Sequence, residues 1–482
     1  MNQVVPFSIG VLMTILGVMF TVPAIVDVTN DNLDWQAFAF SAAISVFIGV
    51  LLMVASMGQA FSLGRREGYV LTVGSWLSMS LMAALPFWLS GQGISFTDAV
   101  FEAVSGLTTT GSTILTGLDA MPPGLLAWRA ILQWIGGIGI IVMAVTLMPF
   151  LRVGGMQLYR LETSDQYDKI TPRIADVCLR IMGVYVVLSL ACALVYWLLG
   201  MTAFEAFIHA MTTISTGGYS TSDQSLGHFG SAGIEWAAVV FMLAGSLPFS
   251  IYIRFLHRLD TKAFTQDSQT PAFLGYTLVF VALFTIFLAL HHPGPILDNL
   301  RMAAFSIVSV ITTTGYASGD YLTWGQGVTT VFLFLTLLGG CAGSTAGGLK
   351  TFRLLTLYKE GMNQTHYLQY PHGLFRTQLG ARPVSADNIR SVHIFFFVMM
   401  GVLSGITLAL SLTGLDFTTS ISAAATSIAN VGPGLGQSIG PSGNFAELSD
   451  PAKWIMDLGM LAGRLEFLTI LVLFLPNFWS DI

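Results

Sequence analysis

The chain has 482 residues, of which 54% are hydrophobic and 10% are charged, and its net charge is −6. Because soluble domains carry about 25% charged residues, this composition excludes a soluble globular protein and predicts an integral membrane protein. The three cysteines, Cys178, Cys192 and Cys341, lie in or beside apolar runs without metal-ligand spacing, so they predict neither a disulfide framework nor a metal centre.

Apolar runs of spanning length predict ten transmembrane helices. They lie at 4–26, 38–62, 69–90, 126–150, 177–200, 234–256, 271–291, 328–356, 391–413 and 453–476. The first run follows no Lys or Arg and is too long for the core of a signal peptide, so we expect it to be retained. Sixteen of the twenty basic residues fall in every second loop, which predicts that both termini are cytoplasmic.

A stretch too short to cross the bilayer lies between two spans at four places, 96–109, 202–214, 299–312 and 417–428. Each begins near a helix N-cap signal: Ser95 or Thr97, Thr202 with Glu205 three residues later, Asp298, and Asp416 or Thr418. We expect half-helices that enter from the outside and aim their negative C-terminal ends at the centre of the membrane.

A short glycine signature follows each half-helix, as TTTGS at 108–112, STGGY at 215–219, TTTGYA at 312–317 and NVGPG at 430–434. The central glycines, Gly111, Gly217, Gly315 and Gly432, recur about every hundred residues, which is the period of a repeat of two spans and an intervening loop. The last copy departs from the others, because Asn430 and Val431 stand where threonines are expected.

These turns have the chemistry of a potassium filter. A dehydrated potassium ion needs several oxygen ligands of modest field strength at once, and glycine permits the dihedral angles that turn carbonyls inward. The predicted filter residues are Thr109, Thr110, Gly111, Ser215, Thr216, Gly217, Thr313, Thr314, Gly315, Asn430, Val431 and Gly432.

The predicted fold is therefore an all-α integral membrane protein with four span, pore-helix, span repeats around a central pore. Two additional spans occupy 1–66, and the repeats occupy 67–160, 161–262, 263–375 and 376–482. The sequence holds no nucleophile with a base, no metal cluster and no dinucleotide fingerprint, so an enzyme is not predicted.

The segments FEAVSGLTTTG, FEAFIHAMTTISTGGYS, GGCAGSTAGGLKTFRLL, NVGPGLG and GRLEF together resemble the Trk, Ktr and HKT superfamily of cation transporters, and most of all its TrkH-type subunit. The resemblance covers nearly the whole chain, including GGMQLYRLE at 154–162. It implies potassium preference, because glycine stands at all four filter positions, and a bacterial inner-membrane location. It also implies a homodimer and a separate cytosolic TrkA-type ring that binds nucleotides.

The resemblance further implies a gating loop below the filter. The segment 339–348 interrupts the span 328–356, and each interior glycine disfavours a helix by about 1 kcal/mol relative to alanine. Close helix packing through small residues is an alternative interpretation. Arg464 lies within the last span at a cost of about 2.5–3.5 kcal/mol, so we expect it to hold this loop. The predicted gate residues are Gly339, Gly340, Gly343, Ser344, Thr345, Gly347, Gly348 and Arg464.

The favoured function is gated, passive potassium conduction inward. The alternative is a symporter that couples potassium to protons or sodium through the same filter. Potassium is then the transported ion and no covalent cofactor is expected, while a nucleotide would act only through the partner ring. Basic residues at 350–390 offer that partner a docking face, and neither pattern nor charge predicts nucleic-acid binding.

Overall fold

The computed structural model describes residues 3–57, 64–146, 174–380 and 382–480. Helices dominate these residues, which confirms the predicted all-α membrane class. The predicted boundary between the first and second repeats, at 160 and 161, lies outside the described residues, as does the stretch 154–162.

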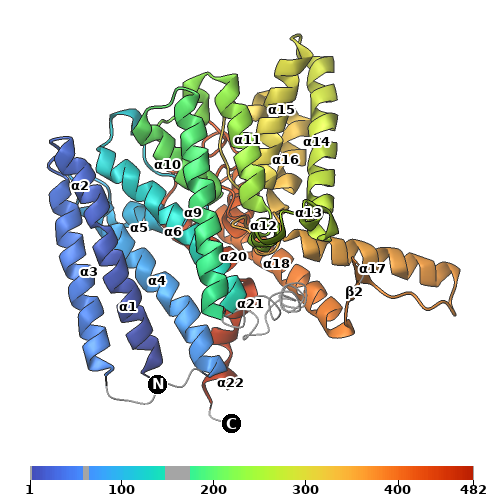
Figure 1. The fold of residues 1–482 in the computed structure, drawn as a ribbon, viewed down its shortest axis with the longest axis horizontal. Coiled ribbons are helices and arrows are strands. Elements are labelled where there is room, and N and C mark those ends of the chain that lie inside the picture. The colour runs from blue at the N-terminus through green and yellow to red at the C-terminus, as the bar shows by residue number, and fades with distance from the viewer. Residues whose placement is uncertain (1–2, 58–63, 147–173, 381, 481–482) are drawn as a thin grey trace.

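The first three helices form a closely packed group at one side of the molecule (Figure 1). They are α1 (Val4–Met19), α2 (Thr21–Thr29), which continues the same span, and α3 (Trp35–Ala55). Gly10 of α1 faces Gly49 of α3 so closely that neither position has room for a Cβ. Small residues of this kind let helix backbones approach within a membrane. Asp27 of α2 then accepts a hydrogen bond from the backbone N–H of Gly124 (2.7 Å), which ties this group to the rest of the fold.

The remaining chain repeats the order of a long helix, a short helix and another apolar helix four times. The first unit contains α4 (Arg65–Leu89), α5 (Phe96–Leu107) and α6 (Pro123–Thr146), and the second α9 (Ile174–Leu198), α10 (Ala203–Ile214) and α11 (Ala232–Ser246). The third contains α14 (Gln269–His291), α15 (Ile296–Ile311) and α16 (Gln326–Leu337), and the fourth α18 (Ala386–Leu412), α19 (Phe417–Ala429) and α20 (Asp450–Arg464).

Side-chain caps begin three of the four short helices where the sequence predicts them. Ser95 caps α5, Asp416 caps α19, and Thr202 caps α10 in a complete capping box with Glu205. The prediction for α15 is wrong, because this helix starts earlier, at Pro295, and Asp298 lies in its first turn. Pro295 is the N-cap that precedes Ile296, and it makes no side-chain cap.

Three of the predicted spans are broken. The chain turns by 91° between α11 and α12 (Phe249–Arg258), next to Pro248. The run 328–356 divides into α16, a loop, and α17 (Thr351–Gln369). The last run ends as a helix at Arg464 and continues as α21 (Phe467–Leu471), η4 (Val472–Phe474) and α22 (Pro476–Trp479). Among the described residues, seven helices, or eight with the bent pair, are long and apolar enough to cross a membrane, so the number of ten crossings stays a prediction.

Within the described residues, the connecting segments also contain short elements. These are η1 (Leu118–Ala120), η2 (Ser225–Phe229), α13 (Lys262–Gln266), η3 (Tyr321–Trp324) and an antiparallel pair of two-residue strands, β1 (Gln378–Leu379) and β2 (Arg382–Pro383).

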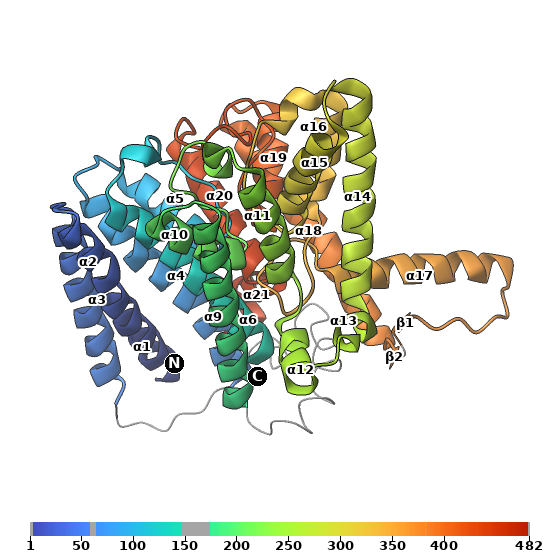
Figure 2. The same ribbon diagram turned by 45° about the horizontal axis from the view of Figure 1, so that its top comes forward.

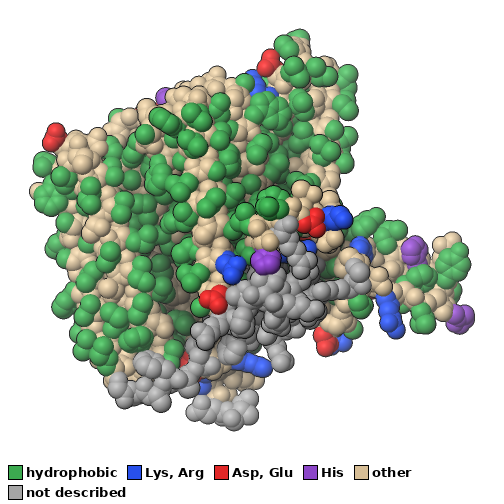
Figure 3. Space-filling view, viewed as in Figure 1, with side chains coloured by type: hydrophobic (Ala, Val, Ile, Leu, Met, Phe, Trp, Pro, Cys, Tyr) green, Lys and Arg blue, Asp and Glu red, His purple; other side chains and the backbone are tan. Residues whose placement is uncertain are grey.

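The arrangement has two distinct ends and an arm. The start of α1 and the C-terminal α22 lie at the same end of the molecule, while α17 projects sideways from the body (Figures 1 and 2). Hydrophobic side chains cover the helices of the body in Figure 3, whereas the charged side chains visible there gather mainly toward the two ends and along α17. This distribution is that of a protein whose middle is surrounded by hydrocarbon.

Candidate functional site

Each of the four short helices ends in the same backbone bend. The bend begins with a residue in the left-handed conformation, with φ of 55°, 52°, 58° and 55° at Thr109, Thr216, Thr313 and Asn430 respectively. A glycine with positive φ follows two residues later in every copy, at Gly111, Gly218, Gly315 and Gly432. Non-glycine residues adopt this conformation only when surrounding structure enforces it, and such strain is typical of functional sites.

The second bend is offset by one residue from the register that the sequence predicts. The sequence places the triplet 215–217 at this bend, but Ser215 is the C-cap of α10, and Gly218 rather than Gly217 has the positive φ. Gly217 instead matches Thr110 and Thr314 of the neighbouring copies, because all three donate their N–H to the short helix five residues before. The two adjacent glycines of STGGY hide this register in the sequence.

The four bends contact one another in a closed ring. A Cβ added to any of the four bend glycines would collide with a carbonyl oxygen of the next repeat. The pairs are Gly111 with Gly217 O, Gly218 with Thr314 O, Gly315 with Val431 O, and Gly432 with Thr110 O. Each repeat therefore touches the next and the fourth touches the first, so the bends encircle a common axis.

The fourth bend closes the ring with different side chains. Asn430 donates from its Nδ2 to the Thr110 hydroxyl (2.9 Å) and to Met460 O (3.0 Å), and the Gly432 N–H donates to the Thr426 hydroxyl (2.9 Å). The backbone geometry of the three threonine copies is thus retained where the sequence departs from them.

A cavity of about 230 Å³ lies on the side of the ring formed by the residues that follow the bends. All four bend glycines line it, together with Asp223, whose carboxylate accepts hydrogen bonds from the N–H groups of Gly117 (2.8 Å) and Leu118 (3.2 Å). Among the described residues, no group of three or more His, Cys, Asp or Glu side chains is placed to hold a metal ion. Backbone and hydroxyl oxygens are therefore the ligands that this ring offers.

A buried ion pair braces the first two bends from behind, and the sequence did not predict it. Arg129 of α6 contacts Glu102 of α5 at 2.7 Å, and both side chains are essentially inaccessible. The same guanidinium donates to Ser220 O (2.8 Å) and to the Thr113 hydroxyl (3.1 Å), and it lies 4.1 Å from the centre of the Tyr219 ring. A charged side chain inside an apolar run requires a partner. The position of Arg129 in the run 126–150 was therefore the feature of the sequence that could have indicated a buried ion pair.

The loop 338–350 lies against the ring on the opposite side. Its Gly347 N–H donates to the Thr313 hydroxyl (2.7 Å), and its Thr345 hydroxyl lies 3.2 Å from that of Thr216. The loop thus contacts the first residues of the second and third bends. The segment 339–348 is irregular and does not form a continuous helix.

Backbone hydrogen bonds and Arg464 hold this loop in place. Arg464 donates to Thr345 O (3.0 Å) in the loop and to Gly136 O (3.4 Å). Gly343 and Gly348 have positive φ, 76° and 65°. Other loop contacts are Gly339 O with the Tyr276 hydroxyl (3.0 Å), Gly340 O with Thr351 N–H (3.1 Å), Gly343 O with Phe249 N–H (3.0 Å), and the Ser344 hydroxyl with Cys341 O (2.7 Å).

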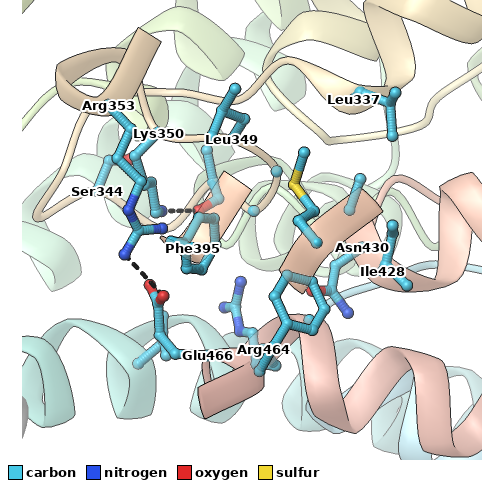
Figure 4. A pocket seen from close by; sticks show the side chains of 18 of the residues that line it. Leu337, Ser344, Leu349, Lys350, Arg353, Phe395, Ile428, Asn430, Arg464 and Glu466 are labelled. Atoms are coloured by element: carbon cyan, nitrogen blue, oxygen red, sulfur yellow. Dashed lines mark hydrogen bonds and ion pairs between the residues drawn. The ribbon is translucent and has the colours of Figure 1, made fainter. Parts of the chain in front are cut away.

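A second, smaller cavity of about 30 Å³ lies between this loop and α20 (Figure 4). Arg353 and Glu466 point toward each other there and form an ion pair of 2.7 Å, and the Arg353 guanidinium lies 3.6 Å from the centre of the Phe395 ring. Lys350 donates to Ala346 O within the loop. Three basic side chains, Lys350, Arg353 and Arg464, therefore surround the space beneath the ring, with Glu466 as their acidic neighbour.

Comparisons with known proteins agree with this geometry. Residues 35–481 match the TrkH family model, which describes a cation transport protein. The chain is 43% identical to the Trk system potassium uptake protein TrkI of Halomonas elongata, over 98% of this chain and 96% of that protein. It is 36% identical to TrkH of Salmonella typhimurium, over 98% of both chains.

The fold is likewise similar to a solved structure. The crystal structure of the potassium transporter TrkH from Vibrio parahaemolyticus superposes with a TM-score of 0.92 at 32% identity, over 99% of both chains. The match of sequence and fold over almost the full length confirms the predicted resemblance, and a cation transport protein is not an enzyme. The chain therefore belongs to the TrkH family of multi-pass membrane cation transport proteins.

Proposed function

We propose that this protein takes up potassium across the bacterial inner membrane through a gated, potassium-selective pore, with the ring of four bends as its filter. The closed ring of bend glycines and neighbouring carbonyls carries this proposal. Four carbonyl-rich turns around one axis can replace the hydration shell of a monovalent cation. The register of the filter is then 109–111, 216–218, 313–315 and 430–432.

The loop 338–350 is proposed as the gate. Its contacts with Thr216 and Thr313 support this role, because a loop held against the inner face of the ring obstructs ion exit. Arg464 would stabilise the closed loop through Thr345 O and add positive charge beneath the filter. Both termini would then be cytoplasmic, because the start of α1 and α22 lie at the same end of the molecule (Figure 1) and the basic residues of alternate loops favour the cytoplasm for that end.

Purified protein in liposomes tests the function. We expect a reversal potential that follows the potassium gradient and responds little to an equal sodium gradient. A reversal potential set by sodium, or an absence of potassium flux, would contradict the proposal.

One observation favours the alternative of proton-coupled symport. Asp457, in the middle of α20, is 3% exposed, and neither of its carboxylate oxygens has a hydrogen-bond partner within the described part of the chain. A buried ionisable group is what a proton-coupled carrier requires. Potassium flux that persists at fixed voltage after the proton gradient is collapsed supports the channel. Flux that stops, and that becomes independent of the proton gradient in Asp457→Asn, supports the symporter.

The proposed partners are a second copy of this chain and a cytosolic nucleotide-binding ring. The arm formed by α17 and the following residues carries apolar side chains that no other part of the described chain covers, including Leu368 at 85% and Leu374 at 94% exposure. These suit a homodimer contact. Basic residues of the same region, Lys359, Arg376 and Arg390, suit an acidic surface of the ring.

A further inference from the structure

Gln133 of α6 makes a contact with the ring that has no counterpart among the described residues of the other repeats. It is fully buried, one helical turn after Arg129. Its Nε2 donates to Gly217 O (2.7 Å), and its Oε1 accepts from the N–H of Tyr219 (3.1 Å). A donor partner at one end and an acceptor partner at the other fix the orientation of the amide group.

The acceptor in this contact belongs to the ring itself. Gly217 O is one of the four carbonyls that lie against the bend glycines, with those of Thr110, Thr314 and Val431. Of these four carbonyls, Gly217 O is the one that receives a hydrogen bond from a side chain within the described part of the chain. A carbonyl oxygen has two lone pairs, so this hydrogen bond fixes its direction and leaves one lone pair for an ion.

Gln133 also explains why the second bend has glycine where two others have threonine. A Cβ added to Gly217 would collide with the amide group of Gln133. The amide is held by both of its hydrogen bonds, so it does not move aside without losing them. Gln133 therefore occupies the space that a threonine side chain would fill at this position.

Two other repeats have methionine at the position equivalent to Gln133, and the bends next to them have threonine where the second bend has Gly217. Three glycines occupy equivalent positions, because each packs on a carbonyl oxygen at the C-terminal end of a short helix. They are Gly136 on Leu107 O, Gly245 on Ile214 O and Gly463 on Ile428 O. Three residues before them stand Gln133, Met242 and Met460. The helix of Met242 packs against α15, which leads to Thr314, and that of Met460 packs against α5, which leads to Thr110. By position, two repeats thus combine a methionine on this helix with a threonine in the bend that follows the neighbouring short helix, and one repeat combines glutamine with glycine.

We propose that Gln133 is a positioning residue for ion selectivity, acting through Gly217 O. This inference rests on the proposed function of the ring. Selectivity depends on the number and field strength of the coordinating carbonyls. By holding one carbonyl in place beside a glycine that lacks its own side chain, Gln133 keeps the second bend in register with the other three.

Reversal potentials in liposomes under opposed potassium and sodium gradients test this role with Gln133→Met, Gly217→Thr and the double variant. The net value of a hydrogen bond, about 0.5–1.5 kcal/mol, corresponds to a fall in the potassium to sodium permeability ratio of about twofold to about tenfold for Gln133→Met. Gly217→Thr alone should lose flux, because the new side chain collides with Gln133. The double variant recreates the methionine and threonine pair, so it should regain flux and selectivity.

Met242→Leu, at the equivalent depth of the second repeat, should keep the wild-type ratio.

The outcomes separate this inference from the function on which it rests. If the wild-type protein shows no potassium-dependent potential, the proposed function is wrong. If the wild type is selective and Gln133→Met keeps the same ratio, or if Gly217→Thr alone conducts as the wild type does, the role of Gln133 is wrong. Should Gln133→Met fail to fold, as judged by size-exclusion chromatography, the recovery or continued loss of flux in the double variant decides.

Discussion

The four bends share one backbone conformation but differ in what their first side chains contact. Thr313 accepts a hydrogen bond from the backbone of the loop 338–350, and Thr216 contacts the Thr345 hydroxyl. The hydroxyl of Thr109 is buried without a hydrogen-bond partner within the described residues. Equivalent positions therefore play different parts, because the loop reaches only one side of the ring.

This difference predicts separable effects of two matched substitutions. Thr313→Val removes the acceptor of the Gly347 N–H and should raise open probability by about twofold to about tenfold, the equivalent of one hydrogen bond. Thr109→Val removes a hydroxyl from the equivalent position without touching the loop, so its open probability should stay at the wild-type level. Single-channel recording in planar bilayers measures open probability apart from conductance. Equal open probabilities in the two variants would contradict the proposal that the hydrogen bond from Gly347 to Thr313 stabilises the closed loop.

The Glu102 and Arg129 pair predicts a large stability effect. Glu102→Ala leaves the buried Arg129 charge without its carboxylate, which should cost about 3–5 kcal/mol of unfolding free energy. Asp298→Ala is the control, because it removes a more exposed carboxylate from Arg301 and should cost less than about 1 kcal/mol. Thermal unfolding in detergent compares the two. A smaller midpoint shift for Glu102→Ala than for Asp298→Ala would show that the pair is not a brace.

At the scale of elements, breaks in helices create the site. Three predicted spans are interrupted, and two of the interruptions, the bend before α12 and the loop 338–350, contact each other through Phe249 N–H and Gly343 O (3.0 Å). Irregular backbone within a membrane is tolerated where protein surrounds it and satisfies its polar groups. The loop meets that condition, because its carbonyl and N–H groups bind α11, α14 and the bends.

The packing of the loop predicts the effect of a single added methyl group. A Cβ at position 347 would collide with Ala429 O at the end of α19, so Gly347→Ala should keep the loop from docking and raise potassium flux without the partner ring by about tenfold or more. Gly361→Ala, on α17 where a Cβ meets nothing within 4 Å, should leave flux unchanged. Rubidium uptake into liposomes measures both. Equal uptake by the two variants would argue against this loop as the gate.

At the scale of the whole molecule, the ring divides the protein into two compartments. The four bend glycines line the larger cavity, and basic side chains surround the smaller one behind the loop. The arm starts at the smaller cavity, which Arg353 of α17 lines, and projects from there away from the body (Figure 2). Its exposed apolar side chains lie away from the ring, which is why they are proposed to contact a second copy.

If the arm forms the proposed contact with a second copy, charged substitutions on it should change the oligomeric state of the protein. Leu368→Glu combined with Leu374→Glu places charges on two of its most exposed apolar positions and should convert dimers to monomers. Light scattering of the protein in detergent measures the mass. Leu290→Glu, at an exposed position on α14 away from the arm, should leave the dimer intact. A dimer that persists in the double variant would exclude the arm as the contact.

The sequence by itself determined the membrane class, the fourfold period and the place of each short helix apart from the start of α15, because hydropathy and capping act over a few residues. Thr202 with Glu205 is an example, since the whole capping box lies within four positions. It also pointed to Arg464 and the glycine loop, because a cation in an apolar run and clustered glycines are locally unfavourable in a membrane helix.

Only the tertiary structure decided the register of the second bend and the bracing of the ring. Gly217 and Gly218 are indistinguishable in the sequence, and their roles follow from contacts with Gln133, more than eighty residues earlier, and with Thr314 of the next repeat. The pairing of Glu102 with Arg129 likewise joins two helices. Such contacts depend on how the repeats close around an axis, and closure is a property of all four together.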